Sequence, residues 1–256
     1  MLETDLSLLE HAARSAGEIA HRYWKNGAKS WEKEDGSGLL TEADLAVDNH
    51  LKSVLLDARP DYGWLSEETT DTPDRLEKSR VFIVDPIDGT RSFASGNDVW
   101  ALSLAVVENG QPVAAALFLP ARDEMILATP DSATWNGSIL TNLSGIPDEA
   151  AEILAPQNVM NASNWKALPV VNRHFRPSLA YRFALIANGE FDAMLTFRPA
   201  WEWDIAAGVL IATASGCKVT DQHGAELEFN MPDPRASGVI AANPDYHQHL
   251  MGLRAI

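Results

Sequence analysis

The chain has 256 residues and 46% hydrophobic content, so it can bury a large core in one big domain or in two tightly joined domains. Its 36 acidic and 20 basic side chains give a formal charge of −16, which argues against nucleic acid and anionic membranes as partners. The single cysteine excludes an internal disulfide, and no apolar run reaches the roughly 18 residues of a membrane span, so we expect a cytoplasmic protein.

The first part of the chain is predicted to contain two helices followed by two strands. Its acidic N-terminus lacks the basic region of a secretory signal, and apolar residues recur at helical spacing over 4–25. A polar, glycine-bearing loop at 33–38 precedes a second predicted helix over 42–57, for which Thr41 is a suitable N-cap. The segments "YGWLS" and "VFIVD" then predict two short strands.

The rest of the chain predicts a sheet and then alternating helices and strands. An antiparallel sheet is expected over 99–129, because Asn-Gly at 109–110 separates two apolar segments. Turn-forming residues are frequent at 146–168, where we place the junction between an α+β domain (1–150) and an α/β domain (151–256). The elements expected in the second domain are a helix at 178–188, a strand at 191–197, a helix at 204–215, strands at 217–220 and 238–241, and a helix at 244–253.

Two aspartates at the end of the second predicted strand form the first candidate site. A buried carboxylate costs several kcal/mol unless something pairs with it. Pro86 stands between Asp85 and Asp88 and is expected to end the strand, because it has no backbone N–H. A turn there would let both carboxylates and the Ile87 carbonyl face a hard cation such as Mg²⁺. A plain turn is the alternative, since Asp-Pro and Asp-Gly are frequent turn sequences.

Further polar groups of the same kind follow other predicted elements. Gly89 allows a close backbone approach, and a short helix beginning at Thr90 would offer free N–H groups to a phosphate. Glu67 and Glu68 come directly after a predicted strand, and Asp204 stands where an apolar helix begins. Taken singly, the glutamates would be solvated loop charges and the aspartate an N-cap. Taken together, they form a metal-site hypothesis.

Several motifs resemble those of the inositol monophosphatase family of metal-dependent phosphatases. They are "WLSEE", "VDPIDGTRSF" and "WEWDIAAG", in this order, and "KEDGSGLLTEADLAVDNHL" resembles the lysine-bearing loop of that family and the segment after it. The similarity runs over most of the chain. It implies a five-layered αβαβα sandwich and a Mg²⁺-dependent phosphomonoesterase that is inhibited by lithium and is often a homodimer.

The resemblance also implies a set of metal ligands. Glu67, Asp85 and the carbonyl of Ile87 would hold one Mg²⁺. A second Mg²⁺ would be held by Asp85, Asp88 and Asp204. Metal ions at these positions would neutralise the phosphate, acidify a bound water and stabilise the leaving alkoxide, so no cysteine or histidine nucleophile is required.

Other implied roles concern a third ion, the phosphate and the attacking water. The third, weaker ion would lie near Glu67, with Asp44 in its outer shell. Gly89 and Thr90 would present N–H groups to the phosphate. Thr90, with Glu67 or Asp44, would position the water.

The cysteine and the histidines are predicted to lie outside the site. Cys217 in "ASGCKVTD" is expected in a buried strand as part of the core. His247 and His249 are two positions apart on a predicted helix and do not share a face, so we interpret both as surface residues.

Substrate choice is where the sequence departs from inositol-specific members. They usually carry a glutamate seven residues before the last metal aspartate, whereas this chain has Phe197 there, followed by Arg198. The segments "LSEE" and "KEDGS" also resemble the 3′(2′),5′-bisphosphate nucleotidase branch. In that branch Arg198 could contact a second phosphate, and a solvated surface arginine is the alternative.

Three functions are therefore open at this point. The leading hypothesis is a Mg²⁺-dependent phosphatase of inositol 1-phosphate or a similar polyol or sugar phosphate. The second is a 3′(2′),5′-bisphosphate nucleotidase acting on 3′-phosphoadenosine 5′-phosphate. The third is a non-catalytic member that uses metal for assembly, and the retained ligand residues argue against it.

Overall fold

The fold was taken from a computed structural model, which describes residues 3–33, 36, 38–142, 145–147 and 149–255. No helix in these ranges is both long and apolar enough to cross a membrane. The α-helices are α1 (Asp5–Tyr23), α2 (Glu42–Ala58), α3 (Thr90–Ala94), α4 (Leu179–Ala187), α5 (Glu202–Ala214) and α6 (Pro244–Leu253), and the short 3-10 helices are η1 (Pro73–Glu77), η2 (Gln157–Met160) and η3 (Ala162–Asn164).

The larger sheet takes its strands from the first part of the chain. Its strand order follows the sequence, with one parallel pair, β3 and β4, and antiparallel pairing elsewhere. The strands are β3 (Gly63–Ser66), β4 (Arg80–Asp88), β5 (Ala101–Glu108), β6 (Gln111–Leu119), β7 (Glu124–Thr129), β8 (Ser132–Trp135) and β9 (Ser138–Ile139).

The second large sheet has the order β11-β10-β12-β16-β14, in which β10 runs parallel to both of its neighbours. Two small two-stranded sheets, β1-β2 and β13-β15, lie outside these large sheets. The remaining strands are β1 (Ser30–Glu32), β2 (Leu39–Thr41), β10 (Ala151–Leu154), β11 (Val171–His174), β12 (Ala193–Thr196), β13 (Ala200–Trp201), β14 (Lys218–Thr220), β15 (Arg235–Ala236) and β16 (Val239–Ala242).

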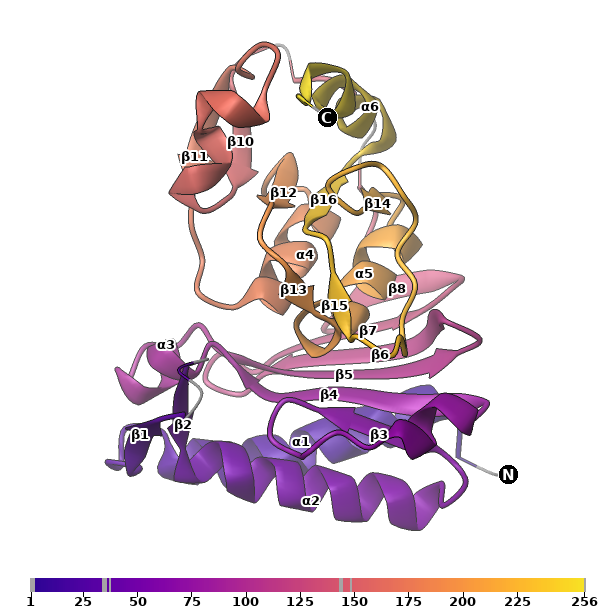
Figure 1. Cartoon of the computed structure of the whole chain (residues 1–256). Helices are drawn as coiled ribbons and strands as arrows, with labels where there is room; N and C mark the ends of the chain where they lie inside the picture. Colours follow the sequence, from indigo (N-terminus) through magenta and orange to yellow (C-terminus); the bar gives the residue numbers. More distant parts are fainter. Residues whose placement is uncertain (1–2, 34–35, 37, 143–144, 148, 256) are drawn as a thin grey trace.

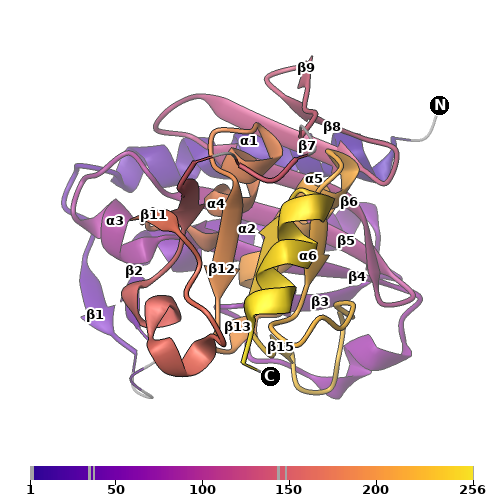
Figure 2. The ribbon, with the colours of Figure 1, turned by 90° about the horizontal axis from the view of Figure 1, so that it is seen from above.

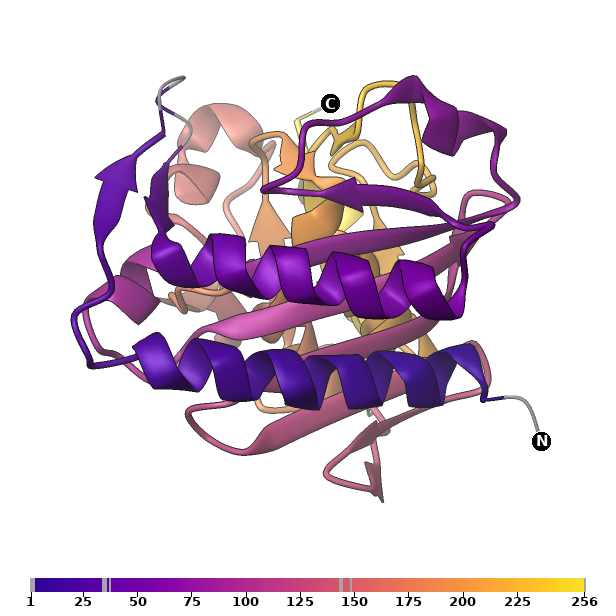
Figure 3. The ribbon, with the colours of Figure 1, turned by 90° about the horizontal axis from the view of Figure 1, so that it is seen from below.

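These elements are stacked in five layers (Figure 1). The helices α1 and α2 lie side by side on the outer face of the larger sheet (Figure 3). Between the two large sheets lie α4 and α5, and α6 covers the outer face of the second sheet (Figure 2). The αβαβα sandwich expected from the motifs is therefore confirmed.

Local sequence explains how the first helices meet the sheet. In α1 the buried residues Leu9, Ala12, Ala16 and Ala20 recur every three or four positions and form one apolar stripe. A Cβ added to Gly17 would lie 2.5 Å from the Phe118 ring on β6, so only glycine allows this close approach. The predicted helix over 4–25 ends two residues early.

The Asn109-Gly110 hairpin is present between β5 and β6. Both residues have positive φ, 51° and 78°, as a two-residue turn of this kind requires. The antiparallel sheet predicted over 99–129 also continues into β8 and β9, which the sequence did not indicate. These two strands are short. They are defined by the pairing of β8 with β7 and of β9 with β8, which local sequence does not show.

Pro86 does not end the strand as expected. β4 continues to Asp88, and its pairing with β5 shifts register between Asp85 and Asp88, with Ser103 and Ala101 opposite those two residues. Such a bulge leaves a residue unpaired, so proline loses no ladder hydrogen bond there. The expectation was wrong because the local sequence does not reveal the bulge.

The segment 146–168 is more structured than its turn-forming residues indicated. It contains β10, which lies inside the second sheet between β11 and β12. Its four residues, AEIL, form a short apolar segment that periodicity alone does not assign to a strand, and turn-forming residues lie on both sides of it. The largest buried apolar cluster includes residues from both proposed domains, such as Leu65 and Leu210, and the division into 1–150 and 151–256 stays a prediction.

The expectations for the cysteine and for His249 are correct, and the one for His247 is wrong. Cys217 is buried directly before β14, and burial raises the pKa of its thiol to about 11, as suits a core residue. His247, expected at the surface, is also buried, and its Nε2 lies 2.9 Å from Thr220 Oγ1. Burial lowers the pKa of His247 to about 4. His249 is exposed, as predicted.

Candidate active site

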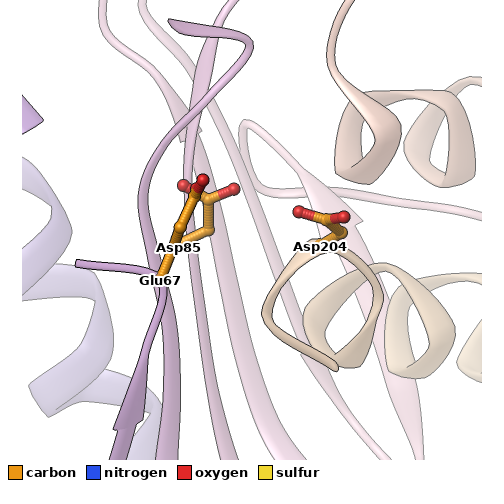
Figure 4. A group of neighbouring side chains, drawn as sticks. All are labelled: Glu67, Asp85 and Asp204. Atoms are coloured by element: carbon orange, nitrogen blue, oxygen red, sulfur yellow. The ribbon is translucent and has the colours of Figure 1, made fainter. Parts of the chain in front are cut away.

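Three carboxylates from distant parts of the chain meet in one place (Figure 4). Oxygen atoms of Glu67, Asp85 and Asp204 all lie within 4.8 Å of one another. Asp204 faces the other two side chains from the N-terminal end of α5. All three are residues that the sequence motifs assigned to a metal site.

Strand pairing explains why Glu67 and Asp85 lie together. β3 and β4 are parallel neighbours, with Ser66 opposite Val84. The residues that follow this pair therefore lie at the same end of the two strands, where their carboxyl ends meet. The backbone N–H of Glu67 donates to the Val84 carbonyl over 3.3 Å. The predicted meeting of the two strand ends is therefore present.

Asp204 comes from the layer between the two sheets. It is the third residue of α5, and Trp201 occupies the N-cap, so the interpretation of Asp204 as a simple N-cap is wrong. Burial, together with the charges of Asp88 and Glu67, raises the pKa of Asp204 well above its usual range. The positive charge of Arg198 partly opposes this rise.

Asp85 is the most enclosed of the three carboxylates. Only 1% of the residue is exposed, and its Oδ1 accepts the backbone N–H of Ile87 over 2.9 Å. Burial raises the pKa of Asp85, and the charges of Glu67, Asp88 and Asp204 raise it further. A divalent cation would relieve this repulsion, and oxygen donors are the ligands that hard cations prefer. The donor set therefore fits a metal of this class.

Asp88 lies beside the three carboxylates and has a second task. Its Oδ2 accepts hydrogen bonds from Ser178 Oγ over 2.7 Å and from the Ala180 N–H over 2.6 Å. Burial raises the pKa of Asp88, while these hydrogen bonds and the charge of Arg182 oppose the rise. Asp88 thus anchors the start of α4. Sequence reasoning missed this contact, because Ser178 signalled only the beginning of a helix.

Asp44 and Thr90, assigned to the attacking water, are in contact. Thr90 Oγ1 lies 3.3 Å from Asp44 Oδ1 and 3.1 Å from the Ile87 carbonyl, so its single proton can serve one acceptor at a time. Asp44 also completes a capping box with Thr41 at the start of α2. Burial raises the pKa of Asp44 to about 6.

Gly89 and Thr90, expected to present N–H groups to a phosphate, form the turn into α3. Gly89 is the N-cap of α3 with φ of 101°, a conformation that other residues rarely adopt. The short helix expected after it begins at Thr90. A Cβ at Gly89 would also lie 3.4 Å from the Val99 carbonyl oxygen, so a side chain there is disfavoured by contact as well as by conformation.

Lys33 is a site residue to which the sequence gave no individual role. Its Nζ lies 2.7 Å from Glu67 Oε1 and 2.9 Å from Glu68 Oε1. Burial would lower the pKa of Lys33, but the two glutamates outweigh this effect and raise it. Glu68 is therefore an ion-paired residue rather than a solvated loop charge. Positions 34, 35 and 37 of the predicted loop lie outside the described residues.

Glu67, Glu68 and Asp204 line a cavity of about 400 Å³. Arg198 lines it together with Glu67 and Asp204. Phe197, which stands where inositol-specific members usually have a glutamate, packs elsewhere: its ring centroid lies 3.7 Å from Cζ of Arg254. The cavity is of the size that holds small metabolites.

Known proteins resemble this chain in sequence and in fold. The model of the inositol monophosphatase family matches residues 1–255. A 3′-phosphoadenosine 5′-phosphate phosphatase of Mycobacterium tuberculosis is 32% identical over 217 residues, which cover 81% of this chain and 80% of that protein. The 3′(2′),5′-bisphosphate nucleotidase CysQ of Escherichia coli K12 is 28% identical over 234 residues, covering 88% and 92%.

Two solved structures extend the comparison to the fold. The IMPase of Thermotoga maritima has a TM-score of 0.82 at 25% identity and covers 97% of this chain and 94% of its own. The extragenic suppressor protein suhB of Bartonella henselae has a TM-score of 0.80 at 26% identity and covers 96% of both chains. With the family match over the whole chain and the acidic cluster in place, the chain belongs to the inositol monophosphatase family and is a metal-dependent phosphomonoesterase.

Proposed function

We propose that this chain hydrolyses nucleoside 3′(2′),5′-bisphosphates, of which 3′-phosphoadenosine 5′-phosphate is the natural test compound. The observation that carries the proposal is Arg198, a cation that lines the same cavity as Glu67 and Asp204. A second phosphate on the substrate would give this arginine a partner of opposite charge. The phosphatase of Mycobacterium tuberculosis and the nucleotidase of Escherichia coli support the same substrate class.

The proposed cofactor is Mg²⁺, bound as two or three ions. Glu67, Asp85 and Asp204 would supply carboxylate oxygens, Ile87 its carbonyl, and Asp88 the carboxylate oxygen that faces away from α4. Bound metal would neutralise the phosphate, lower the pKa of a water and stabilise the leaving oxygen. The all-oxygen donor set and the raised pKa of Asp85 support this assignment.

The chain itself supplies orientation. The Thr90 hydroxyl lies between Asp44 and the Ile87 carbonyl, so it can accept a proton from the attacking water while donating its own to Asp44. Asp44 is oriented by Thr41, which leaves its other oxygen facing Thr90. The backbone at Gly89, held by the positive φ, would bring N–H groups close to the phosphate.

Hydrolysis of inositol 1-phosphate or a similar polyol phosphate is the second candidate. The IMPase of Thermotoga maritima, 25% identical over nearly the whole chain, favours it. Against it stands Phe197, which packs against Arg254 rather than offering a carboxylate to the cavity. The sequence alone favoured hydrolysis of inositol 1-phosphate over hydrolysis of a nucleoside bisphosphate. Because of Phe197 and Arg198 we now propose the nucleotidase function first.

Several properties stay predictions under this proposal. They are the homodimer, the cytoplasmic location, inhibition by lithium and the two-domain division. The single buried Cys217 is compatible with a reducing compartment. Light scattering during size-exclusion chromatography would measure the oligomeric state, and a mass near the monomer's 27.9 kDa would contradict the dimer.

The test compares phosphate release from three compounds with Mg²⁺ and with an EDTA control. They are 3′-phosphoadenosine 5′-phosphate, adenosine 3′-phosphate and inositol 1-phosphate. We expect the bisphosphate to have the highest kcat/KM. Arg198→Ala should reduce the preference for the bisphosphate over adenosine 3′-phosphate about tenfold, or about 1.4 kcal/mol.

Arg22→Ala is the matched control, because Arg22 is exposed in the last turn of α1 and does not line the cavity. It should leave the preference unchanged. Faster release from inositol 1-phosphate in the wild-type protein would overturn the proposal in favour of the second candidate. An unchanged preference in Arg198→Ala would remove Arg198 from substrate binding.

A further inference from the structure

The active-site cavity has an aromatic wall as well as an acidic one. Trp201 and Trp203 line it together with Arg198 and Asp204. The two indole rings are stacked, with centroids 4.6 Å apart and planes 9° from parallel. A phosphate and its metal ions need the carboxylates, but they make no use of two aromatic faces. The wall therefore points to another part of the substrate.

Trp201 is contacted by two neighbouring side chains although it is partly exposed. It belongs to β13, where it pairs with Arg235 of β15. The Arg235 guanidinium lies 5.2 Å from the centre of the Trp201 ring and is itself fixed by Asp233 at 2.7 and 2.8 Å. Even so, 37% of Trp201 stays exposed. An aromatic platform of fixed orientation is pre-organised for a flat ligand.

The local position of Trp201 has no explanation in helix formation. It is the N-cap of α5, where Ser, Thr, Asp and Asn are preferred because their side chains accept a backbone hydrogen bond. The Trp201 side chain makes no such bond. The residue lies instead on the cavity wall with 37% of its surface exposed. A role toward a bound molecule accounts for both observations.

Resting on the proposed function, we propose that the Trp201–Trp203 pair is the subsite that binds the heterocyclic base of the substrate. The base would stack on the part of the pair that is open to the cavity, away from the face that the two indoles share, while Arg198 contacts the second phosphate and the carboxylate cluster lies at the scissile phosphate. Stacking on tryptophan needs only the π-face that every base has. The subsite therefore selects nucleotides over polyol phosphates and tolerates different bases.

The test measures the contribution of the base directly, with or without turnover. Isothermal titration of the Mg²⁺-loaded protein with adenosine 5′-phosphate and with ribose 5-phosphate gives two dissociation constants that differ by the base. In the wild-type protein adenosine 5′-phosphate should bind at least about tenfold more tightly, as expected for one stacked base. Trp201→Leu, which keeps apolar bulk without an aromatic face, should reduce this ratio to below about threefold.

Two variants separate stacking from a change in the fold. Trp201→Phe keeps an aromatic face and should restore most of the ratio. Trp31→Leu changes a similarly exposed tryptophan, 41% accessible on β1, which does not line the cavity, and should keep the full ratio. An equal ratio in the wild-type protein and in Trp201→Leu, or no advantage for adenosine 5′-phosphate at all, would overturn the inference.

The outcomes also separate this inference from the proposed function. If 3′-phosphoadenosine 5′-phosphate is hydrolysed but the ratio does not depend on Trp201, the aromatic subsite is wrong and the nucleotidase function stands. If the bisphosphate is not hydrolysed but the ratio does depend on Trp201, the subsite stands and the substrate is another molecule with a flat ring.

Discussion

Glu202 and Asp204 stand two positions apart in the first turn of α5, yet their carboxylates have opposite surroundings. Glu202 is 2% exposed, and its oxygens accept the backbone N–H groups of Asn230 over 2.7 Å and Met231 over 2.9 Å. Asp204 faces two other carboxylates, Glu67 and Asp85. One acid is satisfied by hydrogen bonds and the other is opposed by like charges.

The surroundings of Glu202 extend into a brace between distant loops. Arg75, 2% exposed, donates to Asn230 Oδ1 over 2.7 Å, to the Met231 carbonyl over 2.9 Å and to Asp71 over 2.7 and 2.9 Å. The brace links the loop after β3, which carries Glu67, to the helix that carries Asp204. We interpret this brace, formed by Asp71, Arg75, Asn230, Met231 and Glu202, as the support that holds the carboxylate cluster together. The carboxylate cluster consists of Glu67, Asp85 and Asp204.

The largest difference between the two acids should appear in activity. Asp204→Asn removes the charge of a candidate metal ligand with little change of shape, and should lower kcat about a thousandfold or more, which is roughly 4 kcal/mol. Asp88→Asn should act in the same direction. Glu202→Gln, two positions away, should stay within about tenfold of the wild-type value, which is 1.4 kcal/mol.

Phosphate release at several Mg²⁺ concentrations would measure these effects, with circular dichroism to check the fold. Near-normal turnover of Asp88→Asn or Asp204→Asn at limiting Mg²⁺ would remove those residues from the metal site. An equally large loss in Glu202→Gln would erase the distinction between the two acids.

The brace should contribute more to stability than to chemistry. Arg75→Ala leaves buried acceptors and Asp71 without their partner, and should lower the free energy of unfolding by about 3 kcal/mol. Arg14→Ala, which breaks an exposed pair with Glu10 within α1, should cost about 0.5 kcal/mol or less. Urea titration compares the two variants, and similar losses would mean that the brace is no stronger than a surface pair.

Bound metal should stabilise the folded chain through the carboxylate cluster of Glu67, Asp85 and Asp204, without involving the brace around Arg75. Mg²⁺ at about 100 times its dissociation constant should add about 2.7 kcal/mol to the free energy of unfolding, because it binds only the folded chain. Asp85→Asn should lose most of this gain, whereas Glu202→Gln should keep it. Thermal unfolding with and without Mg²⁺ at constant ionic strength would decide, and an equal gain in Asp85→Asn would place the metal elsewhere.

The pH dependence of stability gives the smallest effect. Burial raises the pKa of Glu202 from its usual 4.5 to about 7, so between these values the folded chain holds a proton that the unfolded chain releases. This contribution to stability is complete below pH 4.5 and is lost as the pH rises to about 7. In EDTA, wild type should lose about 2 kcal/mol more than Glu202→Gln between pH 5 and 7. Parallel curves for both proteins would contradict the raised pKa.

Much of the fold could be read from local signals. The helix beginning at Glu42 follows a Thr41 capping box, and the hairpin at Asn109-Gly110 has the two positive φ angles that its residues favour. Short strands such as β8 and β10 escaped prediction, because turn-forming residues flank them on both sides and only their neighbours in the sheet define them.

In the active site, too, the sequence predicted the residues carried by local motifs but not the contacts between distant segments. Its carboxylates could be named from motifs, because acids at the ends of apolar segments are costly without a ligand and are therefore conspicuous in a sequence. The contacts of Lys33 with Glu67 and of Ser178 with Asp88 could not be named, since the partners are 34 and 90 positions apart. Nor could the sequence show that Glu202, in the same motif as Asp204, accepts the backbone N–H groups of Asn230 and Met231.

From the sequence by itself, the resemblance of the motifs to a known family predicted the reaction class, the layered fold and the oxygens expected to hold a metal, while periodicity and capping, which act over a few residues, predicted the individual helices and strands. Only the tertiary structure decided which acids repel and which are satisfied, that β4 continues through Pro86 by a bulge, and that His247 is buried. It also placed Trp201 and Arg198 in the cavity of Asp204. The reason is physical: desolvation, charge repulsion and stacking depend on distances between segments, which a linear pattern does not contain.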